Sequence, residues 1–114
     1  MAIKYLKKLS EWGFKTNPLN RLITGVKNLI KKENPSVILV QETKLKRSGQ
    51  VKIKGYTVFD SCRKESGGGG ILLATENESI TNPIQVNANV DDDVEIIVVE
   101  VKLKPIPVRI FCGY

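Results

Sequence analysis

Apolar residues recur along this chain with two different periods, one typical of helices and one of strands. Between residues 19 and 30 they follow three- and four-residue steps, which predicts an amphipathic helix of about four turns. Asn17 and Pro18 suit an N-cap and a first helical position, and the pair Asn34-Pro35 is typical of a helix end. Four apolar residues, 37–40, follow at once and predict a strand that is covered on both faces. A helix that leads directly into a buried strand is half of a β-α-β arrangement.

The first residues of the chain show a weaker helical pattern. Apolar residues stand at three-residue spacing from Ile3 to Trp12, with lysines and a glutamate between them, and Gly13 follows. The spacing predicts a short amphipathic helix over residues 3–12. We therefore expect residues 1–18 to be an appended N-terminal helix and linker, and residues 19–114 to belong to one domain.

The second half of the chain predicts short strands separated by turns. Strands are expected over residues 51–60 (broken near Gly55), 71–75, 94–101 and 107–114, with at best a weak strand in the polar stretch 76–88. The glycines 67–70 precede a strand and lack a following Gly-Lys-Ser/Thr, so a hairpin turn explains them better than a phosphate-binding loop does. The three consecutive aspartates 91–93 are typical of a turn. Short strands at regular spacing predict sheet-on-sheet packing.

Charge is unevenly distributed between the two halves of the sequence. Residues 1–64 hold 15 Lys and Arg against 4 Asp and Glu, a net charge of +11, whereas residues 65–114 hold 3 against 8, a net charge of −5. Such asymmetry is compatible with a polyanionic partner for the first half. Ordinary solvated lysine faces on helices are the alternative, and charge alone slightly favours it.

Composition excludes several classes of chemistry and location. The chain contains no histidine, which removes Ser-His-Asp triads, histidine-ligated zinc and histidine general bases. Hydrolysis by this chain would need a hard cation held by carboxylates and amides. The sequence has no membrane-spanning apolar run and no signal-peptide core, so we expect no membrane contact and an intracellular location, nuclear or cytoplasmic. Its two cysteines have no metal-ligand spacing, and we expect free thiols.

One acidic residue stands at the end of the most apolar strand. Glu42 follows the 37–40 run, between Gln41 and Thr43, and such strand ends are where α/β proteins build sites. Taken alone, a glutamate in this place is more often solvated than a ligand.

The order of motifs resembles that of one enzyme family. The stretch from Asn34 to Leu45, which contains Gln-Glu-Thr at 41–43, resembles the Gln-Glu-Thr motif of the endonuclease/exonuclease/phosphatase family. Gly55-Tyr56, Arg63 and the run 67–73 resemble that family's next hairpin, and residues 94–114 resemble the segment that leads into its Tyr-x-Pro. The most similar variant is the endonuclease domain of non-LTR (LINE-like) retrotransposons, and the resemblance covers residues 19–114.

The resemblance implies an α/β fold, a partial four-layer αββα sandwich of the DNase I-like type, and Mg²⁺-dependent cleavage of phosphodiester bonds. Glu42 would be the metal ligand and Tyr114 would contact the phosphate. The nucleic-acid backbone, expected to be DNA, would be contacted by Lys44, Lys46, Arg47, Arg63 and Lys64. Asn17 and Asn20 are the only candidates for the asparagine with which the family's first strand ends.

The same resemblance implies that this chain is the N-terminal half of such a domain and inactive alone, because the family's Asp-x-Asn and Asp-His elements would lie beyond Tyr114. We then expect partly exposed sheet faces at residues 37–40, 71–73 and 96–99, and self-association through them. Two alternatives stay open. The chain is a non-enzymatic basic module that binds nucleic acid or protein, or it belongs to a phosphatase or phospholipase of the same family.

Overall fold

The computed structural model describes residues 3–6, 18–41, 43, 45, 47, 49–61, 70–80, 82–86, 96–103 and 106–113. These residues form one helix and seven strands: β1 (Ile3–Leu6), α1 (Pro18–Glu33), β2 (Val37–Gln41), β3 (Tyr56–Ser61), β4 (Ile71–Glu76), β5 (Ile84–Val86), β6 (Ile96–Leu103) and β7 (Ile106–Gly113).

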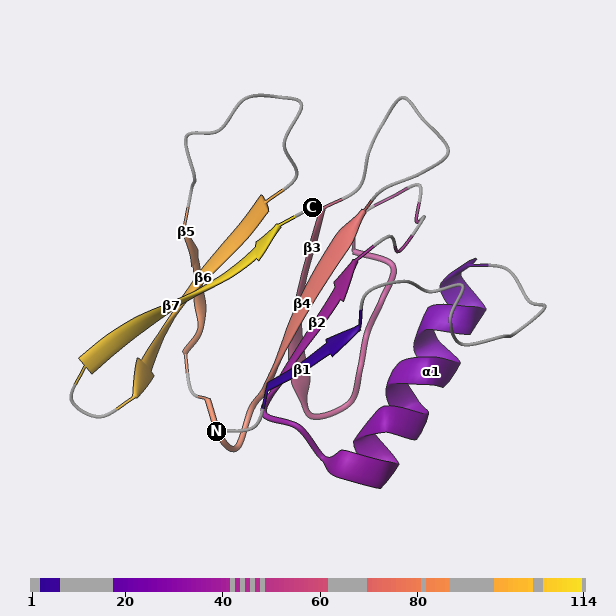
Figure 1. Cartoon of the computed structure of the whole chain (residues 1–114), viewed down its shortest axis with the longest axis horizontal. Helices are drawn as coiled ribbons and strands as arrows, with labels where there is room; N and C mark the ends of the chain where they lie inside the picture. Colours follow the sequence, from indigo (N-terminus) through magenta and orange to yellow (C-terminus); the bar gives the residue numbers. More distant parts are fainter. Residues whose placement is uncertain are drawn as a thin grey trace.

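The strands form two sheets (Figure 1). The first has the order β1-β2-β4-β3, with β1 parallel to β2 and β4 antiparallel to both β2 and β3. The second is an antiparallel sheet in the order β5-β6-β7. Because β4 runs against both of its neighbours, β1, β2 and β3 run in one direction, and their C-terminal ends lie at the same edge of the first sheet.

Helix α1 begins and ends close to where the sequence predicts. It begins at Pro18, where proline's missing N–H and fixed φ do no harm. It ends at Glu33, and Asn34 follows in the left-handed region with a φ of 44°. The Asn34 N–H still donates to the Ile30 carbonyl oxygen at 2.9 Å, which satisfies one of the last carbonyls of the helix. The predicted helix and its end are confirmed.

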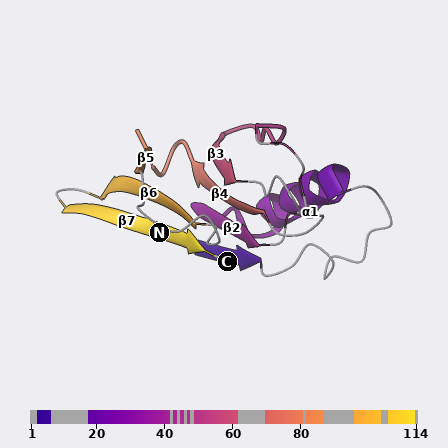
Figure 2. The ribbon, with the colours of Figure 1, turned by 90° about the horizontal axis from the view of Figure 1, so that it is seen from above.

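Strand β2 lies in the middle of three layers, with α1 on one side and the second sheet on the other (Figure 2). Successive side chains of a strand point to opposite faces. Ile38 and Val40 accordingly pack in the cluster that holds Leu22 and Val26 of α1, whereas Val37 packs with the second sheet. Full burial of such a side chain contributes about 1.5–3 kcal/mol each.

The segment between β2 and β3 covers the remainder of the helix-side face. Leu45, Val51 and Ile53 are buried in the same cluster as the core residues of α1. A turn at Gly55, whose φ is 84°, leads into β3. The strand predicted over residues 51–60 is therefore wrong for its first part, since 51–53 form no strand and β3 begins at Tyr56. The predicted strands 37–40, 71–75, 94–101 and 107–114 correspond to β2, β4, β6 and β7.

The N-terminal helix expected over residues 3–12 is wrong at Ile3–Leu6, which form β1. This strand pairs in parallel with β2 in the register Ile3↔Val37 to Leu6↔Val40, so these residues complete the sheet and are not appended to it. Residues 7–12 lie outside the described part of the chain. Pairing with an apolar strand outweighs the three-residue spacing, because a helix as short as the one predicted over residues 3–12 is only marginally stable alone.

The expected exposure of the sheet faces is also wrong. This chain forms both sheets, and each sheet covers a face of the other. Almost all apolar residues of 37–40, 71–73 and 96–99 are therefore buried, and only Leu39 and Ile96 are half-buried. Among the described large apolar residues, Ile84 alone is classed as exposed, at 61%. In the described part of the chain, no helix has the length and apolar character that a membrane crossing requires.

A buried hydroxyl between the sheets predicts a stabilising substitution. The Oγ1 of Thr75 is fully buried and has no hydrogen-bond partner among the described residues. Because an unpaired buried hydroxyl costs about 1–3 kcal/mol, Thr75→Val should raise the free energy of unfolding by about 1 kcal/mol or more in urea titrations. Thr57 is paired with Thr75 in the sheet and is the matched control, since its hydroxyl donates to Asn77 Oδ1 at 2.7 Å. Thr57→Val should lower stability, and equal effects of the two variants would contradict the prediction.

Tyr56 predicts an alkaline limit to stability. Its hydroxyl donates to the Pro35 carbonyl oxygen at 2.5 Å, and burial, with a smaller effect of the Glu76 charge, raises the pKa of the phenol above 10.0. Between the unfolded and folded pKa values the folded chain holds a proton that the unfolded chain has lost, so stability falls as pH rises above 10. Urea titrations from pH 8 to pH 11 should show this decline, and Tyr56→Phe should flatten it while lowering stability at pH 8. An identical pH slope in the two proteins would contradict this.

Candidate functional site

The C-terminal ends of β2 and β3 form a polar edge on the first sheet. Gln41 and Ser61 end these strands, and both are in register with Ile71 of the intervening β4. Two residues after β2 ends, the Thr43 N–H donates to the Gly70 carbonyl oxygen at 3.1 Å, so contact with the start of β4 extends beyond the strand. The backbone is therefore held on both sides of position 42.

Thr43 is the most unusual side chain at this edge. It is fully buried, and its Oγ1 has no hydrogen-bond partner among the described residues. Buried hydroxyl groups are almost always paired, with protein, water or a ligand. A buried hydroxyl oxygen without a hydrogen-bond partner, one residue after a glutamate in the sequence, is consistent with a hard cation bound at this edge.

Asp60, near the end of β3 on the same edge, holds the loop that contains Gly49, between β2 and β3. Its two carboxylate oxygens accept the Gly49 N–H at 3.2 and 3.1 Å. Gly49 has a φ of 80°, a conformation that side-chain-bearing residues rarely adopt. The contact between Gly49 and Asp60 therefore fixes where the segment after β2 turns toward β3. Asp60 has a structural role.

Most of the residues that the sequence singles out lie outside the described part of the chain: Glu42, Tyr114, Asn17, Lys44, Lys46, Arg63 and Lys64. Two are described. Asn20 is exposed on the first turn of α1, and Arg47 is exposed in a bend after β2. Figure 1 places the end of β7 at the same end of the molecule as the end of β2, and Figure 2 agrees. The described residues that precede Glu42 and Tyr114, Gln41 and Gly113, thus share one end of the fold.

The oxygen atoms at this edge are of the kinds that bind a hard cation. The described side chains there offer amide and hydroxyl oxygens, from Gln41, Thr43 and Ser61, and Mg²⁺ prefers oxygen ligands. Gln41 already has an interaction partner. Within the described residues no group of three His, Cys, Asp or Glu gathers.

The structure adds functional candidates that sequence reasoning missed. Lys27, Lys31, Lys52 and Lys54 are exposed on α1 and the neighbouring segment. Their signal was present in the sequence as i, i+4 spacing on the helix and as the alternation Val-Lys-Ile-Lys at 51–54. No sequence pattern indicated that Thr43 is buried, because its burial depends on contact with β4, which lies far along the chain.

The sequence matches no protein-family model and no curated protein. The structure is similar to the endonuclease domain of TRAS1, a telomere-specific non-LTR retrotransposon, with a TM-score of 0.60 and 16% identity over 96% of this chain and 43% of that one. It is similar to the 3′ phosphatase NExo from Neisseria bound to a product DNA hairpin, with a TM-score of 0.53 and 20% identity over 96% and 40%. A third similar structure is TDP2 of D. rerio complexed with a single-strand DNA product, with a TM-score of 0.54 and 14% identity over 99% and 45%.

These similarities extend over nearly the whole of this chain. At 14–20% identity they establish a shared fold and nothing finer. This chain spans less than half the length of each of the three solved chains.

The orphan hydroxyl at the polar edge gives a direct test. With metal removed by EDTA, Thr43→Val should raise the free energy of unfolding by about 1 kcal/mol, because a buried unpaired hydroxyl is replaced by a methyl group. Thr43→Ser, which keeps the hydroxyl but opens a small gap, should lower it. Urea titrations of the three proteins measure both changes. A loss of stability in Thr43→Val would reveal a protein partner for the hydroxyl and contradict the orphan.

Proposed function

We propose a nuclease function for this chain, whose fold is the DNase I-like fold of the endonuclease/exonuclease/phosphatase type. The chain is the N-terminal half of a Mg²⁺-dependent phosphodiesterase domain, most similar in kind to a retroelement DNA endonuclease, and is inactive alone. The observation that carries the proposal is the polar edge at the end of β2. There, β4 holds the backbone on both sides of the Gln-Glu-Thr glutamate, at the end of the fold that β7 also reaches.

Each residue of the proposed site has a role that its chemistry suits. Glu42 supplies the carboxylate for the cation, and Asn17 or Asn20 is a candidate second oxygen ligand. When bound, Mg²⁺ supplies Lewis-acid polarisation of the scissile phosphate and charge stabilisation at the leaving oxygen. Tyr114 donates its hydroxyl to a phosphate oxygen.

In the proposal, five basic residues bind the DNA backbone. They are Lys44, Lys46, Arg47, Arg63 and Lys64, in the half of the chain with a net charge of +11. Phosphate contacts of this kind give affinity without sequence preference and weaken as salt increases. A nuclear or cytoplasmic location belongs to the same proposal. Two of the similar solved structures are complexes with DNA, by their descriptions.

A phosphatase acting on small or DNA-terminal phosphates is the second candidate. The similar Neisseria protein is described as a 3′ phosphatase, and one fold supports several substrates. Cleavage assays should therefore offer both an internal phosphodiester and a 3′-phosphate end.

The role of Glu42 can be tested by cation binding and by cleavage. Calorimetric titration of the 114-residue chain with Mg²⁺ should give a signal that Glu42→Gln abolishes, because the substitution removes the only charged ligand proposed. Extended to full domain length, the wild-type chain should nick supercoiled DNA with Mg²⁺, and Glu42→Gln should slow nicking by about 100-fold or more, as loss of a charge-stabilising group does. Glu78→Gln, an exposed glutamate in the turn after β4, is the control and should change neither result.

Two outcomes would contradict the proposal in different ways. Nicking that survives Glu42→Gln would remove Glu42 from the site. Salt-dependent DNA binding that is indifferent to Mg²⁺, with no cleavage by the extended chain, would favour the non-enzymatic basic module.

A further inference from the structure

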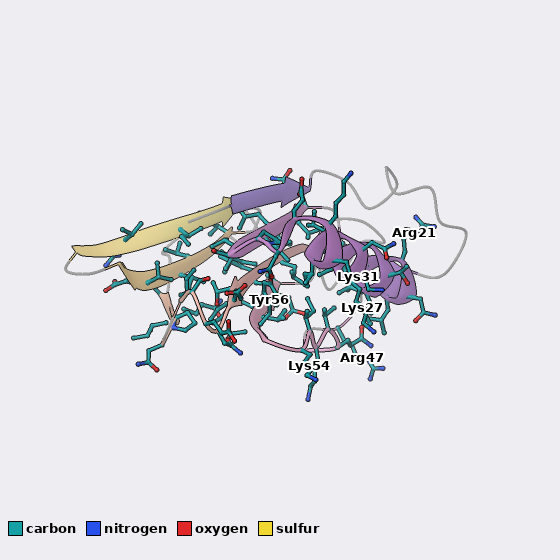
Figure 3. The ribbon with its side chains drawn as sticks, turned by 90° about the horizontal axis from the view of Figure 1, so that it is seen from below. Arg21, Lys27, Lys31, Arg47, Lys54 and Tyr56 are labelled. Carbon is teal, nitrogen blue, oxygen red and sulfur yellow. The ribbon has the colours of Figure 1, made fainter. Side chains whose placement is uncertain are left out.

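Five exposed cations lie along one side of the fold, on α1 and on the segment between β2 and β3. Figure 3 shows Lys27 and Lys31 on the side of α1 that faces this segment, together with Arg47 and Lys54 on the segment itself, while Arg21 lies toward the other end of the helix. Lys52, between Arg47 and Lys54 in the sequence, is also exposed. We call these five residues, Lys27, Lys31, Arg47, Lys52 and Lys54, the basic side surface.

Local structure fixes the direction of these cations. Lys27 and Lys31 are four residues apart on a helix and so lie on one face. On the segment, Val51 and Ile53 are buried at 3% and 8% exposure, whereas Lys52 and Lys54 alternate with them and are exposed. The apolar residues attach the segment to the core, and the lysines are thereby turned to solvent.

The charges of the basic side surface are not used within the fold. None of the five side chains makes a hydrogen bond or ion pair with another described residue. Asp60, the described acid whose carboxylate contacts this segment, accepts the Gly49 N–H. Five like charges held along two adjacent elements repel one another, and a polyanion would relieve that repulsion.

An open hollow lies within this surface. It has a volume of about 440 Å³ and is lined by Gly49, Val51, Lys52, Ile53, Lys54, Tyr56 and Val58. Its lining is polar and apolar in about equal parts and includes Tyr56, and its lysines are exposed. The Tyr56 ring is held by the hydrogen bond from its hydroxyl to the Pro35 carbonyl oxygen. An aromatic ring beside cations is the arrangement on which unpaired bases stack while phosphates contact lysine.

We propose that the basic side surface binds single-stranded nucleic acid, with phosphates on the five cations and one unpaired base in the hollow. Arg47 and Lys54 are seven residues apart, so they are separated by at most about 25 Å. A lipid surface fits less well, because interfacial binding needs exposed apolar residues and Val51 and Ile53 are buried. Binding here needs no metal ion and does not involve Glu42, so it goes beyond the proposed nuclease site, with which it shares only Arg47.

The experiment uses the 114-residue chain and fluorescence anisotropy with a labelled 12-nucleotide oligo-dT in EDTA. Lys52→Glu with Lys54→Glu, or Lys27→Glu with Lys31→Glu, should weaken binding about tenfold or more and make the salt dependence shallower by about 1.4 in log–log slope, because two phosphate contacts are lost. Lys32→Glu is the matched control for the helix. It removes the same charge about 100° around α1 from Lys31 and should weaken binding less than twofold.

Comparison ligands test the base and the class of partner. A fully abasic strand of equal length, and a duplex, should bind more weakly than oligo-dT. Equal affinity for the intact strand and the fully abasic strand would overturn the assignment of a base to the hollow. Equal weakening by Lys32→Glu, or equal affinity for poly-glutamate, would overturn the nucleic-acid surface. Circular dichroism melting confirms that each variant folds, and Lys→Ala pairs replace any Glu pair that does not.

Glu42→Gln separates this inference from the proposed function. The substitution should leave oligo-dT binding in EDTA unchanged. Loss of EDTA-resistant binding in that variant would show that the strand binds at the polar edge and overturn the separate surface.

Discussion

Burial of β2 and β4 on both faces is the constraint on which the rest of this structure depends. Val37, Ile38 and Val40 are fully buried, as are the four apolar residues of β4 from Ile71 to Ala74. A strand that is apolar on both faces cannot have its register fixed by alternation, because a one-residue slip exchanges one apolar set for another. The register must therefore be fixed at the ends of the pair.

Two hydrogen bonds do this at opposite ends. The Glu76 N–H donates to the Ser36 carbonyl oxygen at 2.8 Å before β2 begins, and the Thr43 N–H donates to the Gly70 carbonyl oxygen at 3.1 Å after it ends. Between them, five residues of β2 are paired with β4. Burial of the apolar residues supplies the free energy that holds β2 and β4 together, and the hydrogen bonds at the two ends set their register. The same end contact that fixes the register also holds the backbone at Thr43, the residue after the glutamate of the proposed metal site.

The sequence predicted the elements whose structure depends on their own residues. It failed for the elements whose structure depends on contacts with residues far along the chain. The helix at 18–33 was predictable because its apolar stripe, its proline and its terminal asparagine all agree. Ile3–Leu6 became a strand because β2 offered an unpaired edge, which three-residue spacing does not reveal. The expected exposure of the sheet faces failed because β6 and β7 already bury them. At the candidate site, Gln-Glu-Thr pointed to the correct edge of the sheet, but the buried Thr43 hydroxyl depends on β4, 28 residues further on.

The alternation at residues 51–54 connects the failed strand prediction with the basic side surface. Valine, lysine, isoleucine, lysine is a period of two, and a period of two predicts a strand. The physical cause of that period is an extended segment with one side on an apolar core, and pairing with another strand is not required. Here Val51 and Ile53 pack against the cluster that holds Leu22 and Val26, so the segment is extended and anchored without joining a sheet. The residues on its outward side are exposed lysines, on the same side of the fold as the lysines of α1. One sequence pattern therefore closes the helix-side core and, by the same geometry, gathers positive charge on the surface.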